Sequence, residues 1–262
     1  MKPLDDAYAN APYIPDADSY PPRWQQEAKA FRDALGARAE LGIRYGESDR
    51  QVVDLFHPEG PATGALIFVH GGYWKAFDQR SWSHLAAGAL ASGWAVAMPG
   101  YDLCPDARIS EITQQIAKAT ALIAARAQGP MALTGHSAGG HLVCRMMDPA
   151  VLGVEVRERI RCIAPISPVA DLVPLLETTM NDVLHLDANE AQAESPVSAP
   201  APKTAVKVWV GGAERPAFLE QAHALAVAWS VPEVVVPHKH HFDIIEALSD
   251  PTSDLVQFLM GY

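Results

Sequence analysis

The sequence has few cysteines, and this limits the environment in which the protein works. Its 262 residues include three of them, Cys104, Cys144 and Cys162, which are odd in number and far apart. A secreted domain held by disulfides usually has an even number of cysteines at closer spacing. We therefore expect reduced thiols and a cytoplasmic location.

Long apolar runs and a signal core are also missing. No stretch approaches the roughly 20 apolar residues that a membrane-spanning helix needs. The first residues include Lys2, Asp5 and Asp6 and carry no apolar signal segment. We expect no membrane partner.

Basic residues are scarce relative to acidic ones. The chain has 20 lysines and arginines against 31 aspartates and glutamates, a net charge of −11. This balance argues against nucleic acid and anionic membranes as partners. A hydrophobic content of 49% and this length suit one globular domain over residues 1–262, with a small molecule as its partner.

The first 22 residues differ from the rest of the chain. They hold five prolines and several aspartates, which predicts an irregular arm at residues 1–22. A disordered tail is the alternative. Tyr8, Tyr13, Ile14 and Tyr20 are the residues expected to pack on the body if the arm is ordered.

After the arm, apolar strands alternate with amphipathic helices. Residues 39–45 and 51–57 alternate like an antiparallel hairpin, and 65–69 is a continuous apolar run, as in a strand buried on both faces. The pattern predicts an α/β fold with a mostly parallel sheet and helices on both faces. The other expected strands are 94–98, 130–133, 160–166, 205–210 and 234–237, and the expected helices are 24–35, 82–92, 109–127, 141–147, 217–230 and most of 244–260.

Residues 171–202 interrupt this rhythm. The segment is rich in Glu, Asp, Pro and Ser, and its leucines suggest two short helices. An insertion at this point would lie over the carboxyl ends of the strands, where α/β folds bind ligands. It is either a small cap that forms a pocket wall or a long surface crossover.

The motif Gly-x-Ser-x-Gly occurs at Gly135, Ser137 and Gly139, between an expected strand and an expected helix. A serine on a sharp strand-to-helix turn is the nucleophile elbow of α/β-hydrolases. The glycines matter because a Cβ at either one would collide with the neighbouring strand or helix. Ser137 is therefore the candidate nucleophile.

The base and acid are expected later in the chain, in the order Ser, Asp or Glu, His. His238, His240 and His241 follow one strand, and we favour His241 because it directly precedes Phe242 and the last helix. A metal cluster is the alternative reading of this His-x-His-His run, although it lacks a carboxylate or cysteine at ligand spacing. Glu214 is the carboxylate of the turn after strand 205–210, and Asp171 is its competitor.

The loop after the strand 65–69 reads His70-Gly71-Gly72-Tyr73-Trp74. Its glycines let the N–H groups of Gly71 and Gly72 approach a substrate carbonyl, with the N–H of Ala138 as a further oxyanion donor. Tyr73, Trp74 and Tyr101 are expected to line the cleft and to stack on an aryl ring, unless they are ordinary packing residues.

This loop resembles the His-Gly-Gly-x-Trp signature of the kynurenine formamidase (arylformamidase) branch of the α/β-hydrolases. The similarity runs from about Tyr8 to the C-terminus. It includes the Ser-Pro-x-Phe-x-x-Gln stretch that follows the family's acid, which reads Arg215-Pro216-Ala217-Phe218-Leu219-Glu220-Gln221 here. Segments 101–105, 135–142 and 241–246 are similar to the family as well.

The resemblance implies an α/β-hydrolase with a catalytic Ser137, His241 and Glu214 and without a metal or cofactor. It implies hydrolysis of N-formyl-L-kynurenine to L-kynurenine and formate. The family usually has Asp where this chain has Glu214, so the loop is expected to draw back slightly.

Two other functions remain open at this stage. One is a carboxylesterase or thioesterase for small acyl esters, whose loop usually reads His-Gly-Gly-Gly without the Trp74 signature; the other is a non-catalytic binding protein. A homo-oligomer is compatible with the fold. Arg108, Asn181 and Asp182 are candidates for binding the amino-acid end of the substrate, and His84 and His136 are expected to be structural.

Overall fold

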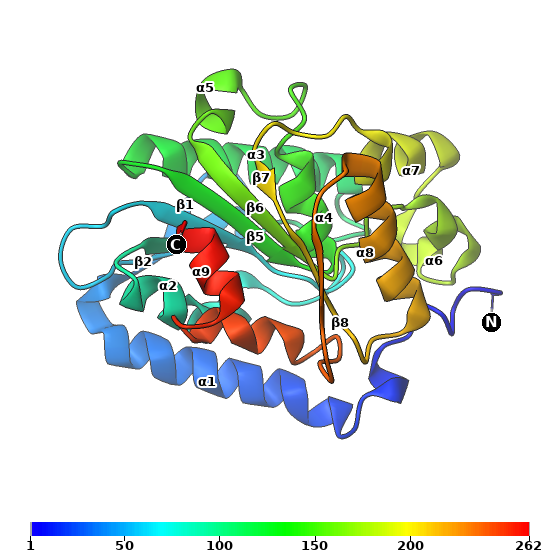
Figure 1. The fold of residues 1–262 in the computed structure, drawn as a ribbon, viewed down its shortest axis with the longest axis horizontal. Coiled ribbons are helices and arrows are strands. Elements are labelled where there is room, and N and C mark those ends of the chain that lie inside the picture. Colours follow the sequence, from blue (N-terminus) through cyan, green and yellow to red (C-terminus); the bar gives the residue numbers. More distant parts are fainter. Residues whose placement is uncertain (1, 262) are drawn as a thin grey trace.

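The computed structural model describes residues 2–261, which form one sheet flanked by helices (Figure 1). Within this range the sheet has nine strands, in the order β1-β2-β4-β3-β5-β6-β8-β9, with the short β7 paired to β6. The strands are β1 (Ala39–Arg44), β2 (Val52–Phe56), β3 (Ala65–Val69), β4 (Ala95–Pro99), β5 (Met131–His136), β6 (Ile160–Ile166), β7 (Ala205–Val206), β8 (Val208–Gly211) and β9 (Glu233–Val236).

Strand direction follows the sequence pattern. The hairpin strands β1 and β2 pair antiparallel to each other, and β2 pairs antiparallel to β4, whereas the pairs from β4 through β3 and β5 to β9 are parallel. Every residue of β3 and β5 is buried, in agreement with the apolar runs at 65–69 and 130–133. The predicted mostly parallel α/β sheet is confirmed.

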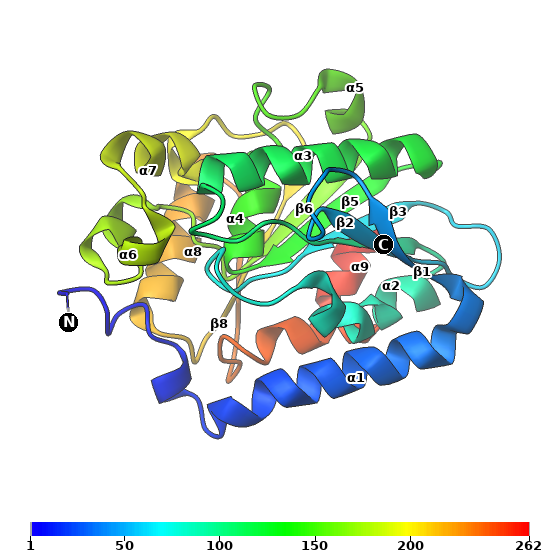
Figure 2. The ribbon, with the colours of Figure 1, turned by 180° about the vertical axis from the view of Figure 1, so that it is seen from behind.

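Helices cover both faces of this sheet (Figures 1 and 2). One buried cluster joins the sheet to α3, α4 and α8, and a second joins its other face to α1, α2 and α9. In α3 the buried Ile109, Ile112, Ile116 and Ile123 recur every three to seven residues, which places them on one side of the helix. The helices are α1 (Tyr20–Leu35), α2 (Ala87–Ala91), α3 (Ile109–Arg126), α4 (Ala138–Arg145), α5 (Val154–Arg157), α6 (Asn181–Leu184), α7 (Ala188–Glu194), α8 (Pro216–Trp229) and α9 (Asp254–Met260).

Three expected elements are divided in the structure. Segment 82–92 consists of the 3-10 helix η4 (Gln79–Ala86) followed by α2, and strand 205–210 is split into β7 and β8 at Lys207. Segment 244–260 consists of η7 (Ile244–Ser249) and α9. Pro251 lies at this last break, where a proline disfavours helical conformation in the preceding residue.

The N-terminal arm lies against the body of the protein. Its short helices η1 (Ala11–Tyr13) and η2 (Ala17–Ser19) lead into α1. Tyr8 and Ile14 are buried, while Tyr13 is half exposed. Residues 8–12 of the ordered arm lie beside the carboxyl ends of the parallel strands, where the candidate site lies.

No helix in the range 2–261 combines the length and the apolar character that a bilayer crossing requires.

Candidate active site

Ser137 lies on the sharp turn between β5 and α4. Its backbone has φ 56° and ψ −116°, outside the conformations that most residues adopt. A Cβ on Gly139 would lie 1.9 Å from the carbonyl oxygen of Val69 in β3, and one on Gly135 would lie 2.3 Å from the carbonyl oxygen of Gly139. As predicted, a Cβ at either glycine would collide with a neighbouring element, so only glycine lets β3, β5 and α4 approach this closely.

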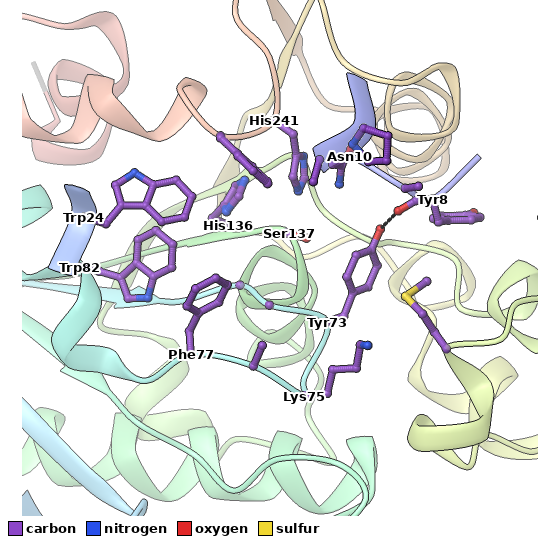
Figure 3. Close-up of a pocket in the computed structure, with 18 residues that line it drawn as sticks. Tyr8, Asn10, Trp24, Tyr73, Lys75, Phe77, Trp82, His136, Ser137 and His241 are labelled. Carbon is purple, nitrogen blue, oxygen red and sulfur yellow. Dashed lines mark hydrogen bonds between the residues drawn. The ribbon is translucent and has the colours of Figure 1, made fainter. Parts of the chain in front are cut away.

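His241 lies in the loop after β9, and Glu214 lies in the turn after β8. The Nδ1 of His241 donates a hydrogen bond to Oε2 of Glu214 over 2.5 Å, and both side chains are buried. Ser137 and His241 line the same cavity (Figure 3). The structure therefore brings together the serine, histidine and glutamate that the sequence pattern singled out.

Glu214 is held by two further donors. Its Oε1 accepts hydrogen bonds from Oγ of Ser167 (2.5 Å) and from the N–H of Gly211 (2.8 Å). Asp171, the competing carboxylate, instead accepts from the N–H of Val173. Glu214 is the carboxylate that can orient the imidazole, and Ser167 is a positioning residue that the sequence reasoning missed.

Aromatic packing fixes the plane of His241. The rings of Phe218 and His136 pack against its ring at tilts of 48° and 43°, with centroids 4.2 and 4.5 Å away. Phe218 belongs to the stretch after Glu214 that resembles the formamidase family, which gives that motif a physical role. Burial, with a smaller contribution from nearby His241, lowers the pKa of His136 well below 6.5, so this ring remains neutral.

The other two histidines of the loop have different surroundings. His240 accepts backbone N–H groups of Phe242 and Asp243 on Nδ1, and its Nε2 hydrogen-bonds the hydroxyl of Tyr20. His238 is exposed. Among residues 2–261, no group of three or more His, Cys, Asp or Glu side chains is arranged to hold a metal ion.

The loop after β3 packs against Ser137. A Cβ on Gly71 would lie 2.8 Å from the carbonyl oxygen of His136 and 3.1 Å from the Cβ of Ser137. The N–H groups of Gly71, Gly72 and Ala138 have no acceptor among the described residues. They are available to an oxyanion, and that of Ala138 lies at the positive end of α4.

The three aromatic residues expected in the cleft are not equivalent. Tyr73 lines the cavity, but Trp74 and Tyr101 are fully buried and do not line it. Tyr101 stacks on His70 at 4.3 Å and donates a hydrogen bond to its carbonyl oxygen, and Trp74 packs edge-on against His141. The prediction that Trp74 and Tyr101 line the cleft is wrong, because their buried side chains instead support residues 70–74, which we call the oxyanion loop, through His141 and His70.

The cavity has a volume of about 390 Å³, within the range of about 300–1,000 Å³ typical of ligand pockets. Its wall is largely aromatic and comes from α1, the oxyanion loop, η4 and residues 237–243 after β9 (the histidine loop), with the N-terminal arm on another side (Figure 3). The aromatic lining residues are Tyr8, Trp24, Tyr73, Phe77, Trp82 and Phe242, beside the two histidines.

Segment 171–202 contributes Met180 to this wall. It contains α6, α7 and the 3-10 helices η5 (Val173–Glu177) and η6 (Pro196–Ser198). Buried carboxylates attach it to the body: Glu190 accepts from Arg108, and Glu194 accepts from Arg145. These contacts attach the segment to the start of α3 and to α4, and Met180 is its residue in the cavity wall.

The candidates for the amino-acid end of the substrate do not line the cavity. Arg108 binds Glu190, Asp182 lies 3.6 Å from Lys2, and the side chain of Asn181 bonds the backbone of Leu186. His84 is outside the lining as well, whereas His136 belongs to it. Sequence reasoning gave no role to Asn10, which the arm places in the cavity wall.

Comparisons with known proteins agree with this geometry. A sequence model described as alpha/beta hydrolase fold matches residues 66–241. A kynurenine formamidase from Salmo salar is 25% identical over 240 residues, covering 86% of this chain and 82% of that protein. A kynurenine formamidase from Drosophila melanogaster is 28% identical over 238 residues, covering 83% and 79%.

Solved structures extend the comparison. A Silicibacter sp. TM1040 protein provisionally called a thioesterase superposes with a TM-score of 0.98 at 57% identity, over all of both chains. An esterase from Pyrobaculum calidifontis shares the fold, with a TM-score of 0.67 at 18% identity over 94% of this chain and 93% of its own. The comparisons confirm the resemblance to the kynurenine formamidase branch, and this chain belongs to the alpha/beta hydrolase fold family.

Proposed function

We propose that this hydrolase cleaves N-formyl-L-kynurenine to L-kynurenine and formate through a formyl-enzyme on Ser137. One observation carries the proposal: Ser137 and His241 open on a cavity walled by the rings of Trp24, Phe77 and Trp82. Such a wall suits an aryl group next to the scissile bond. The sequence likeness to kynurenine formamidases supports the same substrate.

The first half of the reaction forms the formyl-enzyme. His241 takes the proton of the Ser137 hydroxyl while Oγ attacks the formyl carbon. Glu214 stabilises the imidazolium through the Nδ1 hydrogen bond. The N–H groups of Gly71, Gly72 and Ala138 bind the oxyanion, and such donors are typically worth about 3–4 kcal/mol each.

The second half returns the enzyme to its starting state. His241 protonates the leaving aryl nitrogen, which breaks the C–N bond and releases the arylamine. Water then gives a proton to His241 and attacks the formyl ester, so that formate leaves and Ser137 regains its proton. The scheme uses no metal or cofactor.

A carboxylesterase or thioesterase is the second candidate, because the 57% identical Silicibacter protein is provisionally called a thioesterase. An elbow serine can cleave amides, esters and thioesters by the same steps. The leaving group alone separates these reactions.

Turnover of N-formyl-L-kynurenine by the purified protein tests the proposal. We expect kcat/KM above about 10⁴ M⁻¹s⁻¹, lost in Ser137→Ala. The comparison substrates are p-nitrophenyl acetate and acetyl-coenzyme A. Ester or thioester cleavage that needs Ser137, without formamide cleavage, would move the protein to the second candidate. Turnover that persists in Ser137→Ala would remove the serine from the mechanism.

A further inference from the structure

The N-terminal arm forms part of the cavity wall through residues 8–12. Two hydrogen bonds fix it there: the hydroxyl of Tyr73 donates to the carbonyl oxygen of Tyr8 (2.7 Å), and Nε2 of Gln221 donates to the hydroxyl of Tyr8 (2.9 Å). On the outer side, Arg215 binds Asp6. The arm therefore presents a defined surface to the substrate.

Besides Tyr8, whose hydroxyl is bound by Gln221, the arm contributes the polar side chain of Asn10 to this surface. It is 8% exposed, and its Oδ1 is fully buried without a hydrogen-bond donor among the described residues. Its side chain does not cap η1, although its carbonyl oxygen accepts the N–H of Tyr13. Folding gains nothing evident from this carboxamide, and a buried polar group without a partner is costly.

The other buried polar atoms of the wall differ from Asn10 in chemistry or place. The indole nitrogen of Trp82 is unpartnered too, but it can only donate. Nε2 of His136 is also unpartnered, but that ring packs against His241 and beside Gly71, where a Cβ would lie 3.2 Å from its Nδ1. In Figure 3, Asn10 and His241 lie on one side of Ser137, and Tyr73 and Lys75 on the other.

We propose that Asn10 is a specificity-determining residue: rotation about its Cβ–Cγ bond turns the enclosed Oδ1 towards the cavity, where it accepts a hydrogen bond from the N–H of the scissile amide. This inference rests on the proposed function, because it concerns the leaving group. His241 must deliver its proton to the lone pair of the leaving nitrogen. An acceptor for the N–H on the same side of the cavity holds that nitrogen in a fixed orientation.

An ester places an oxygen without a hydrogen where the amide has N–H. Oδ1 of Asn10 would then remain buried without a donor when the ester binds. Sites that hydrogen-bond an N–H or O–H discriminate against analogues that lack it for this reason. Asn10 is thus expected to favour N-aryl formamides over aryl esters.

The test compares wild type with Asn10→Leu, which has nearly the same shape and no hydrogen-bonding atoms. Substrates are formanilide, N-methylformanilide (which lacks the N–H) and p-nitrophenyl acetate. We expect kcat/KM for formanilide to fall about 10- to 100-fold, with little change for the other two. The thermal midpoint should stay level or rise, because a buried unpartnered polar group is removed.

Tyr13→Ala is the matched control. It removes the ring that stacks on Arg215 at 3.6 Å and so loosens the arm without altering Asn10. Tyr13→Ala should keep the wild-type preference for formanilide. An equal loss on all three substrates in Asn10→Leu, or the same change of preference in Tyr13→Ala, would overturn the role of Asn10.

The two proposals fail in different ways. If wild type cleaves the ester but not formanilide, the formamidase function fails, and inhibition of ester cleavage by formanilide and N-methylformanilide becomes the readout. Weaker inhibition by formanilide alone in Asn10→Leu would still support the hydrogen bond. Unchanged inhibition, or no inhibition of wild type, would overturn it.

Discussion

At the scale of single residues, Glu214 shows how a glutamate occupies a place where the resembling family usually has aspartate. The turn after β8 is closed by a hydrogen bond from the N–H of Glu214 to the carbonyl oxygen of Gly211. The side chain folds back over this turn, so that Oε1 accepts the N–H of Gly211 while Oε2 reaches His241. The extra methylene is accommodated within the turn, and the bond to the imidazole is retained.

Glu214→Gln should lower kcat about 10³- to 10⁴-fold, because an amide can donate to Nδ1 and so favour the wrong tautomer of His241. KM should change little, since Glu214 does not line the cavity. Steady-state kinetics on the best substrate measure both parameters. Activity within tenfold of wild type would show that Glu214 does not orient the base.

We expect Ser167 to contribute less to kcat than Glu214. Ser167→Ala removes one of the donors to Oε1 and leaves the N–H of Gly211 in place. A smaller kcat loss than in Glu214→Gln, with KM unchanged, fits a positioning role. A rise in KM alone would instead place Ser167 in substrate binding.

At the scale of elements, the oxyanion loop combines backbone strain with deep burial. Tyr73 and Trp74 both have positive φ, at 50° and 55°, where a side chain is unfavourable. The consecutive left-handed residues turn the chain so that Tyr73 faces the cavity while Trp74 is buried against His141. The tryptophan of the His-Gly-Gly-x-Trp pattern therefore acts here as a buried support.

Trp74→Ala should reduce the free energy of unfolding by about 3–5 kcal/mol, as expected for a large buried aromatic side chain. Because the support of Gly71 and Gly72 is lost, kcat should fall to a similar degree for aryl and alkyl substrates. Urea denaturation and kinetics on phenyl and ethyl esters measure these effects. If Trp74 stacked on the substrate, KM would rise for the phenyl ester alone and stability would change little.

What the sequence could predict depends on how local each feature is. The elbow, the oxyanion loop and the histidine loop each follow a strand that the apolar pattern predicts. Ser137, Gly71 and His241 could therefore be placed on one edge of the sheet. Ser167 and Asn10 carry no such local signal. Ser167 reaches Glu214 only because β6 and β8 are neighbours, and Asn10 reaches the cavity only because the arm folds back.

The same distinction explains the aromatic residues. The pattern His-Gly-Gly-x-Trp shows that large side chains follow the glycines, but not on which side of the loop they lie. The positive φ angles of Tyr73 and Trp74 decide on which side each side chain lies. Packing of Trp74 on α4 and the hydrogen bond from the N–H of Cys104 to the carbonyl oxygen of Trp74 hold this conformation.

At the scale of the whole molecule, several histidines are enclosed in neutral form. Burial lowers the pKa of His70, His84 and His141 to about 4 in each case, and that of His136 well below 6.5. His70 lies in the oxyanion loop and His84 in η4, while His136 lies at the elbow and His141 in α4. Protonation of the unfolded chain is therefore linked to the stability of both sides of the sheet.

The effect of pH on stability follows from these shifts. Above pH 6.5 the histidines are neutral in both states, so their burial has no pH-dependent cost. As the pH falls from 6.5 towards 4, the unfolded chain binds protons that the native protein does not, so the native state loses stability. Each histidine that stays neutral contributes about 1.4 kcal/mol per pH unit. Asp54, whose pKa burial raises, acts in the opposite direction.

We therefore expect the free energy of unfolding to fall steeply between pH 6.5 and about 4, as measured by urea denaturation across this range. His141→Gln should make the slope shallower, because glutamine can still donate to the carbonyl oxygen that His141 Nε2 contacts at 2.8 Å but does not titrate. His238→Gln is the control, since His238 is exposed, and its slope should match wild type. A flat profile between these pH values, or equal slopes for wild type and His141→Gln, would mean that these histidines take up protons in the native state.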